Sequence, residues 1–229
     1  MELPSRGEFY HEDHPFYKQE AVEIRFMTAK DEDILSSQAL IKKGLVIDRL
    51  LNSLIVENVD SSSLLTADRS ALLVAARISS YGSDYAVTYN CPKCFTKNEV
   101  NFNLKHSTIQ AKCFDEEYLE KNGVFYNEET LTFDVTLPTS GVVVGLGLLD
   151  GEAEKSISIE QQENLITKML SAIVIKVNDN VDARYVNDFI NTMPARDSKY
   201  IRDIYPSLAP NYKLVHEFVC QGCLFTEEK

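Results

Sequence analysis

The chain has 229 residues, of which 44% are hydrophobic and 25% charged, as in a globular protein with its own core. Its net charge of −12 argues against nucleic-acid binding, which depends on cationic contacts with phosphates. No apolar run reaches the roughly 20 residues that span a bilayer, and residues 1–10 lack the apolar core of a signal peptide. We therefore expect a cytoplasmic protein that binds neither nucleic acid nor membrane and whose thiols stay reduced.

Residues 1–20 are polar, but they contain aromatic side chains that follow no regular period. Phe9, Tyr10, Phe16 and Tyr17 lie among charged residues. Terminal segments are often poorly ordered, and aromatic side chains are favoured at interface hot spots. The sequence therefore predicts a flexible or partner-docking arm, with these four residues as its partner-binding side chains.

Residues 21–82 are predicted to be mainly helical. A weak alternation over residues 22–27 predicts a short strand. Apolar residues then recur at helical spacing until Ile55 with an interruption at Gly44, which predicts one broken helix or two helices. Thr66 is a suitable N-cap for another helix, which we expect to end near Tyr81 and Gly82.

Residues 83–150 are predicted to be rich in β-structure. Alternating apolar residues lead into a first CxxC motif and follow it again, a pattern typical of a strand, a knuckle and a strand. A short acidic helix over residues 115–121 is expected next. Strict alternation over 131–137 predicts a half-buried strand, and the turn at 138–141 predicts a hairpin with a return strand over 142–146.

Residues 151–211 are predicted to be helical again. Ser158 with Gln161 fits a capping box, and an apolar face follows from Leu165 to Val174.

Two further helices are expected over residues 182–191 and from Pro194, a residue favoured at the first helical position. We expect Pro206 and Pro210 to end the second of them. Residues 212–229 begin with an alternation that predicts a final strand leading into a second CxxC motif. The expected fold class is α+β: N-terminal helices, a central antiparallel β section with zinc-knuckle hairpins, and C-terminal helices returning to a final strand, in one continuous domain from residue 21.

Four of the five cysteines form the two CxxC motifs, Cys91 with Cys94 and Cys220 with Cys223. A CxxC turn supplies two thiolates, and a structural zinc ion binds four in a tetrahedron. The motifs lie much farther apart than the roughly 15–20 residues of a compact zinc ribbon, although closing a long loop should stabilise the chain more than closing a short one. We predict that these four residues bind one structural Zn²⁺ ion, with no position left open for catalysis.

Three other interpretations of the cysteines stay open. A redox dithiol is one, although a catalytic CxxC usually begins a helix that lowers the thiol pKa, and strand patterns flank both motifs here. A zinc ribbon that binds nucleic acid or a transcription complex is another, and unliganded thiols are the third. Cys113 is expected to be a free buried cysteine, with a role as a metal ligand as the open alternative. No catalytic constellation is recognisable around the four histidines, so we do not expect an enzyme.

Several motifs in a fixed order resemble one known family. They are LPSRG at residues 3–7, TAKDEDIL at 28–35, the run at 41–51, and DR through RISSYG at 68–82, followed by the first CxxC motif. In these motifs the chain resembles the baseplate hub assembly proteins of T-even-like contractile-tailed bacteriophages (myoviruses), most densely over residues 3–95 and more weakly at 136–141 and at the second knuckle.

The resemblance implies an assembly factor or minor structural component that contacts other baseplate hub or tail proteins. Such a protein would be found in the host cytoplasm during assembly or in the tail baseplate of the virion. The present sequence differs from the family pattern in one respect, because only six residues follow Cys223. We therefore expect no full return strand after the second knuckle.

Overall fold

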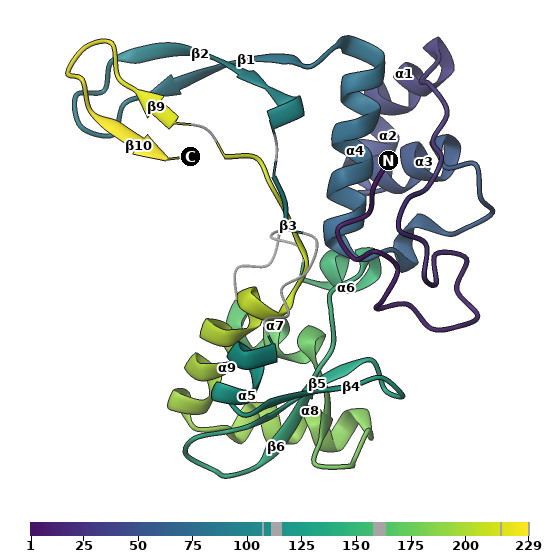
Figure 1. The fold of residues 1–229 in the computed structure, drawn as a ribbon, viewed down its shortest axis with the longest axis vertical. Coiled ribbons are helices and arrows are strands. Elements are labelled where there is room, and N and C mark those ends of the chain that lie inside the picture. The colour runs from purple at the N-terminus through teal and green to yellow at the C-terminus, as the bar shows by residue number, and fades with distance from the viewer. Residues whose placement is uncertain (107, 111–115, 158–163, 216, 229) are drawn as a thin grey trace.

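The computed structural model describes residues 1–106, 108–110, 116–157, 164–215 and 217–228, and it confirms the predicted α+β class. Figure 1 shows α1–α4 grouped in one half of the molecule and the four-stranded sheet with α5, α7, α8 and α9 in the other half. The β1–β2 hairpin projects from α4, the β9–β10 hairpin is reached through β8 after α9, and the two meet at one corner (Figure 1). Among the described residues, no helix has both the length and the apolar character needed to cross a membrane.

The N-terminal helices lie where the sequence pattern predicted them, but the expected broken helix or helix pair is three helices, because the chain also breaks at Ser37. They are α1 (Ala29–Ser36), α2 (Gln38–Lys42), α3 (Val46–Leu54), the 3-10 helix η1 (Ser61–Ser63) and α4 (Thr66–Tyr81). The predicted interruption at Gly44 is confirmed, because this residue has φ +66°, a conformation that glycine adopts more readily than residues with a side chain. The strand expected over residues 22–27 is wrong, since this stretch contributes only an isolated bridge from Ile24 to Ile55. Thr66 is the first residue of α4 rather than its N-cap.

The antiparallel sheet consists of four strands in the order β4-β5-β6-β7. They are β4 (Val124–Asn127), β5 (Thr132–Thr136), β6 (Val143–Leu146) and β7 (Val174–Val177). The predicted hairpin is the β5–β6 pair. The sequence pattern did not predict β4, and it placed Val174 in a helix although this residue begins β7.

The remaining helices are α5 (Glu116–Lys121), α6 (Gly151–Ser156), α7 (Leu165–Ile173), α8 (Ala183–Thr192) and α9 (Ala195–Leu208). Pro206 does not end α9, contrary to expectation, because it lies in the last turn. Tyr205 and Leu208, on either side of it, are buried in the core. This packing favours the continuation of the helix for two residues beyond Pro206. The capping box predicted at Ser158 and Gln161 lies outside the described residues.

The other strands form three antiparallel pairs, β1–β2, β3–β8 and β9–β10. They are β1 (Asp84–Asn90), β2 (Lys97–Asn103, followed by the 3-10 helix η2, Leu104–His106), β3 (Thr108–Gln110), β8 (Asn211–Lys213), β9 (Glu217–Val219) and β10 (Thr226–Glu228). The single final strand that we expected is thus two strands, β8 and β9. A short return strand of three residues does follow the second knuckle, since Thr226 pairs with Val219, whereas the return strand of the first knuckle has seven residues.

Residues 1–20 are part of the core rather than a free arm. The exposed fractions of Phe9, Tyr10 and Phe16 are 7%, 4% and 0%. The Phe9 ring meets the edge of Tyr126 in β4 at a centroid distance of 5.6 Å and lies 6.2 Å from Phe133 in β5. The prediction of a flexible or partner-docking arm is therefore wrong for Phe9, Tyr10 and Phe16, because these rings fill space between the helices and the sheet. Tyr17 is half-buried.

Asp68, on α4, binds this N-terminal segment to the helical half of the molecule through hydrogen bonds. The carboxylate is fully buried, and it accepts hydrogen bonds from the backbone N–H of Ser5 (3.0 Å), the Ser5 hydroxyl (2.6 Å) and the Tyr10 hydroxyl (2.7 Å). Burial raises the pKa of Asp68. The N-terminal segment therefore joins α4 to the sheet, and both contacts depend on its being folded.

A second buried carboxylate, Asp31, organises the start of α1. It is 1% exposed and accepts two hydrogen bonds of 2.8 Å from Arg25, and others from Thr28 and Ser53. The hydrogen bond from Arg25 is the main cause that holds the pKa of Asp31 well below its ordinary value. Because Arg25 is 41% exposed, solvent screens part of this ion pair.

Asp31→Asn is expected to lower the free energy of unfolding by about 1–3 kcal/mol near neutral pH, since it weakens a buried charge-assisted network. The depressed pKa means that this contribution is present above the unfolded pKa of about 3.9 and is lost as the pH falls. Urea unfolding at pH 7 and pH 3 measures both effects. A difference between wild type and variant that stays constant down to pH 3 would contradict this account.

Candidate metal centre

The two CxxC motifs lie in the turns of two short hairpins. The first connects β1 to β2 and the second connects β9 to β10. Although the motifs are distant in sequence, the chain just after the first hairpin pairs with the chain just before the second as the antiparallel pair β3–β8, with Thr108 opposite Lys213. Because β3 follows the first hairpin and β8 precedes the second, this pairing carries both hairpins to the same place.

The backbones of the two knuckles have the same conformation. In each knuckle, the residue after the second cysteine donates its N–H to the carbonyl of the first: Phe95 to Cys91 at 2.9 Å, and Leu224 to Cys220 at 3.0 Å. Phe95 has φ +60° and Leu224 has φ +57°. The two halves therefore present their sulfur atoms in the same way.

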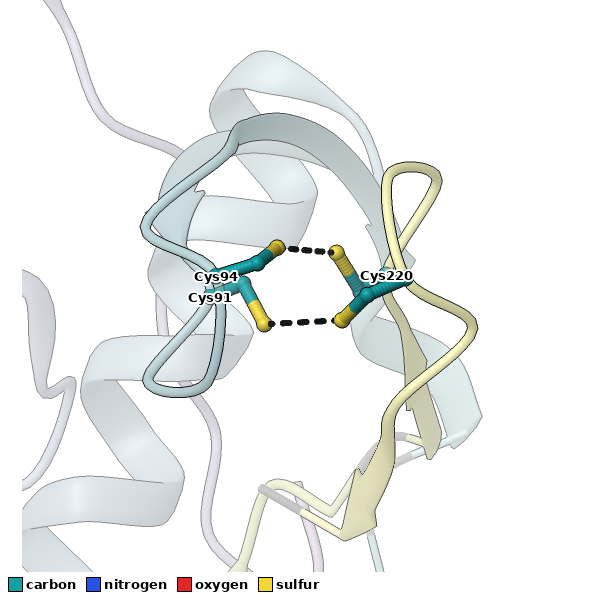
Figure 2. Close-up of side chains that lie close together, drawn as sticks. Cys91, Cys94 and Cys220 are labelled. Atoms are coloured by element: carbon teal, nitrogen blue, oxygen red, sulfur yellow. Dashed lines mark hydrogen bonds between the residues drawn. The ribbon is translucent and has the colours of Figure 1, made fainter.

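The structure brings the four predicted cysteines into one cluster. The Sγ atoms of Cys91 and Cys223 lie 3.7 Å apart, and those of Cys94 and Cys220 lie 3.5 Å apart (Figure 2). All four atoms lie within 4.8 Å of one another. A tetrahedral zinc ion with Zn–S bonds of about 2.3 Å requires sulfur separations of about 3.8 Å, so the cluster has the size of such a site.

Backbone and side-chain amides point at the sulfur atoms and would stabilise thiolates. The N–H of Lys93 lies 3.4 Å from Cys91 Sγ, and the N–H of Gly222 lies 3.3 Å from Cys220 Sγ. Asn98 adds a side-chain contact of 3.7 Å to Cys220 Sγ. Donors around the sulfur atoms favour the deprotonated ligands that a metal ion needs.

Asn98 joins the two knuckles, and sequence analysis did not single it out. It is 2% exposed; its amide nitrogen donates to the carbonyl of Thr96 (2.8 Å), and its Oδ1 accepts from the N–H of Gln221 (2.9 Å). Gly222 packs closely against this region, since a Cβ there would lie 2.6 Å from Thr96 Oγ1. The sequence signal that could have identified this residue is an Asn within a β-strand next to a knuckle, where a polar side chain can bind the backbone of the other knuckle.

The thiols in this cluster cannot all ionise without a nearby cation. Hydrogen bonds with the side chain and then the backbone of Thr96 lower the pKa of Cys94 to about 6. The pKa of Cys223 is raised to about 12: the N–H of Phe225 lowers it, but burial and hydrogen bonds to neighbouring sulfur atoms outweigh this effect. Like charges a few ångströms apart oppose each other, and a divalent cation would remove this penalty.

The cluster is the centre of a small core of its own. Cys91 and Cys220 are fully buried together with Phe218, whose ring meets Tyr89 edge-on at 4.6 Å, whereas Cys94 is exposed. This group is separate from the main core. Because so small an apolar group stabilises little by itself, a metal ion would be its main cross-link. We call the two hairpins with this cluster the knuckle module.

The chemistry of the four sulfur ligands fits a closed structural site better than a dithiol enzyme. A strand, not a helix, follows each CxxC motif, so the helix N-terminus that activates a redox cysteine is missing in both. Within the described ranges, this is the one group of Cys, His, Asp and Glu side chains arranged to hold a metal ion. Cys113 lies outside the described residues. Of the four aromatic residues predicted as partner-binding, Phe9, Tyr10 and Phe16 belong to the main core, which is separate from this cluster, and Tyr17 is half-buried.

Comparison with known proteins gives one match. A family model described as "T4 bacteriophage base plate protein" matches residues 3–228. No curated protein and no solved structure matches the chain. The match covers both CxxC motifs, the helical half and the sheet.

Proposed function

Because this chain belongs to the family of T4 bacteriophage base plate proteins, we propose that it serves the baseplate hub as an assembly factor or minor structural component. Its family assigns it to the tail of the virion and to interaction with other phage tail proteins. Action on the central hub, during assembly in the host cytoplasm, is the more specific role that we propose. The observation that carries the proposal is a family match over almost the whole chain.

We further propose that the knuckle module binds one Zn²⁺ ion through Cys91, Cys94, Cys220 and Cys223. Sulfur separations of 3.5 and 3.7 Å and amides directed at the sulfur atoms support this assignment. Four protein ligands close the coordination sphere, so the metal would have a structural role and the protein no metal-based catalysis. A rigid, metal-stapled module suits a protein that works through contacts with other proteins.

Disabling the gene in the phage that encodes this chain is expected to leave tails without complete baseplates. Supplying the wild-type protein from a plasmid should restore them, and electron microscopy with counts of infectious particles measures both results. Normal baseplates in its absence would contradict the proposed role.

Metal content is tested separately on the purified protein. We expect one zinc per chain by elemental analysis, and protein without bound metal would contradict the zinc assignment while leaving the baseplate role intact.

A further inference from the structure

We propose that the knuckle module is a docking tip whose exposed Phe95 and Leu224 insert into an apolar socket, edged by carboxylates, on another protein of the tail. This inference rests on the proposed function and names the contact through which the chain would act. It concerns residues that neither bind the metal ion nor belong to the core.

Phe95 and Leu224 are the most exposed large apolar side chains in the part of the chain that the structure describes. Their exposed fractions are 79% and 78%. Each follows directly after a cysteine of one sulfur cluster, so both side chains belong to the same small module. Figure 1 shows this module projecting from the rest of the molecule. The chain thus holds two large apolar groups in water on a rigid projection.

The backbone at both positions gives an independent reason to infer a function. With φ values of +60° and +57°, Phe95 and Leu224 occupy the left-handed region that glycine and asparagine adopt most readily. A large apolar residue there is strained, and such strain is found mainly where a site needs it. Since neither side chain is buried within the chain, folding alone does not explain why these residues stand there.

The charges beside Phe95 indicate the chemistry of the partner surface. Lys93 and Lys97 are both exposed, and neither forms an ion pair among the described residues. No acidic residue lies between 91 and 98, although the chain as a whole carries a net charge of −12. An apolar tip flanked by lysines fits an apolar socket with Asp or Glu at its rim, because complementary charge steers and orients association.

A second copy of this chain is a poorer fit for the socket. Two tips that met end to end about a twofold axis would bring Lys93 and Lys97 of both copies close together, and like charges in contact are unfavourable. The described residues also form a hollow of about 750 Å³, whose charged lining residues are Lys43, Arg69, Lys155 and Glu154. Three cations against one carboxylate do not complement a lysine-flanked tip. We therefore assign the socket to a different tail protein.

Photo-crosslinking in infected cells tests the contact directly. A photo-reactive phenylalanine analogue is introduced at position 95 of the full chain, which complements phage lacking the gene. The control is position 125 in β4, because Phe125 is also highly exposed, at 68%. We expect an adduct with another tail protein, through a peptide containing apolar and acidic residues, at 95 and not at 125. An adduct with a second copy of the chain, or equal yields at both positions, would overturn the proposal.

The variants Phe95→Asn and Leu224→Asn separate docking from stability. Asparagine tolerates the left-handed backbone, so each variant should keep its zinc and have a melting temperature equal to or above that of the wild type. With the crosslinked protein purified as the probe, each should lose about 30-fold in affinity if the side chain is a hot spot. Phe125→Asn should bind like the wild type.

Phage complementation separates the failure of this inference from the failure of the proposed function. If baseplates assemble normally without the chain, the proposed function fails. If the chain is required but the double variant Phe95→Asn, Leu224→Asn supports assembly as well as wild type, the docking tip alone is overturned.

Discussion

Cys220→Ser is expected to abolish metal binding and to unfold the knuckle module while the sheet and its helices stay folded. Structural zinc sites contribute about 10–16 kcal/mol of apparent binding free energy, which matches or exceeds the roughly 5–15 kcal/mol that stabilises a whole domain. The module has its own small core around Cys91, Phe218 and Cys220, separate from the main one. Loss of the metal should therefore unfold the knuckle module before it affects the main core.

Elemental analysis and limited proteolysis measure this outcome together. Cleavage should appear within residues 84–103 and 217–228, and a chelator should produce the same pattern in the wild-type protein. Cys113→Ser is the matched control, because Cys113 belongs to neither knuckle, and it should retain one zinc per chain. A Cys220→Ser protein that keeps its zinc, or resists protease as the wild type does, would refute the four-cysteine site.

Phe16→Ala is expected to lower the free energy of unfolding by about 3–5 kcal/mol, the usual effect of truncating a buried Phe. Phe16 is fully buried in the main core. Deletion of residues 2–20 also removes Tyr10 and the donors of Asp68, which would leave a buried carboxylate without partners. Since a domain has only about 5–15 kcal/mol of stability, the deleted protein should not fold.

Urea unfolding of the Phe16→Ala protein, and circular dichroism of the deleted one, measure these effects. Tyr17→Ala is the control, because Tyr17 is only half-buried and its truncation should change the free energy of unfolding far less than Phe16→Ala. A deleted protein that melts cooperatively at the wild-type temperature would restore the expectation of an independent arm.

Local patterns in the sequence located most of the helices and the sulfur cluster. The helical face broken at Gly44, the strict alternation that became β5 and the strand-knuckle-strand pattern at Cys91 all depend on neighbours in the chain. The cysteines are a special case, because a structural zinc ion requires four ligands at one place. The sequence therefore predicted that the two motifs lie together, although it did not predict the β3–β8 pair that brings them together.

The largest failure concerns contacts between distant parts of the chain. The N-terminal segment has no helical or strand period because it turns repeatedly, with φ +51° at Arg6 and +71° at Gly7. The ring contacts of Phe9 come from Tyr126 and Phe133, more than a hundred residues later, and no local pattern reports them. Likewise, Val174 begins β7 directly after α7, with no turn residue to mark the change.

The positions of the cysteine motifs in the chain also determine when, during synthesis, the knuckle module can form. Half of the sulfur ligands lie at residues 91–94 and half at 220–223. At translation rates of about 5–20 residues per second, the second pair follows the first by on the order of 10 s. A nascent chain can therefore bury much of its main core while its knuckle module is still incomplete. Unfinished chains would lack the tip, so premature contacts on the ribosome would be avoided.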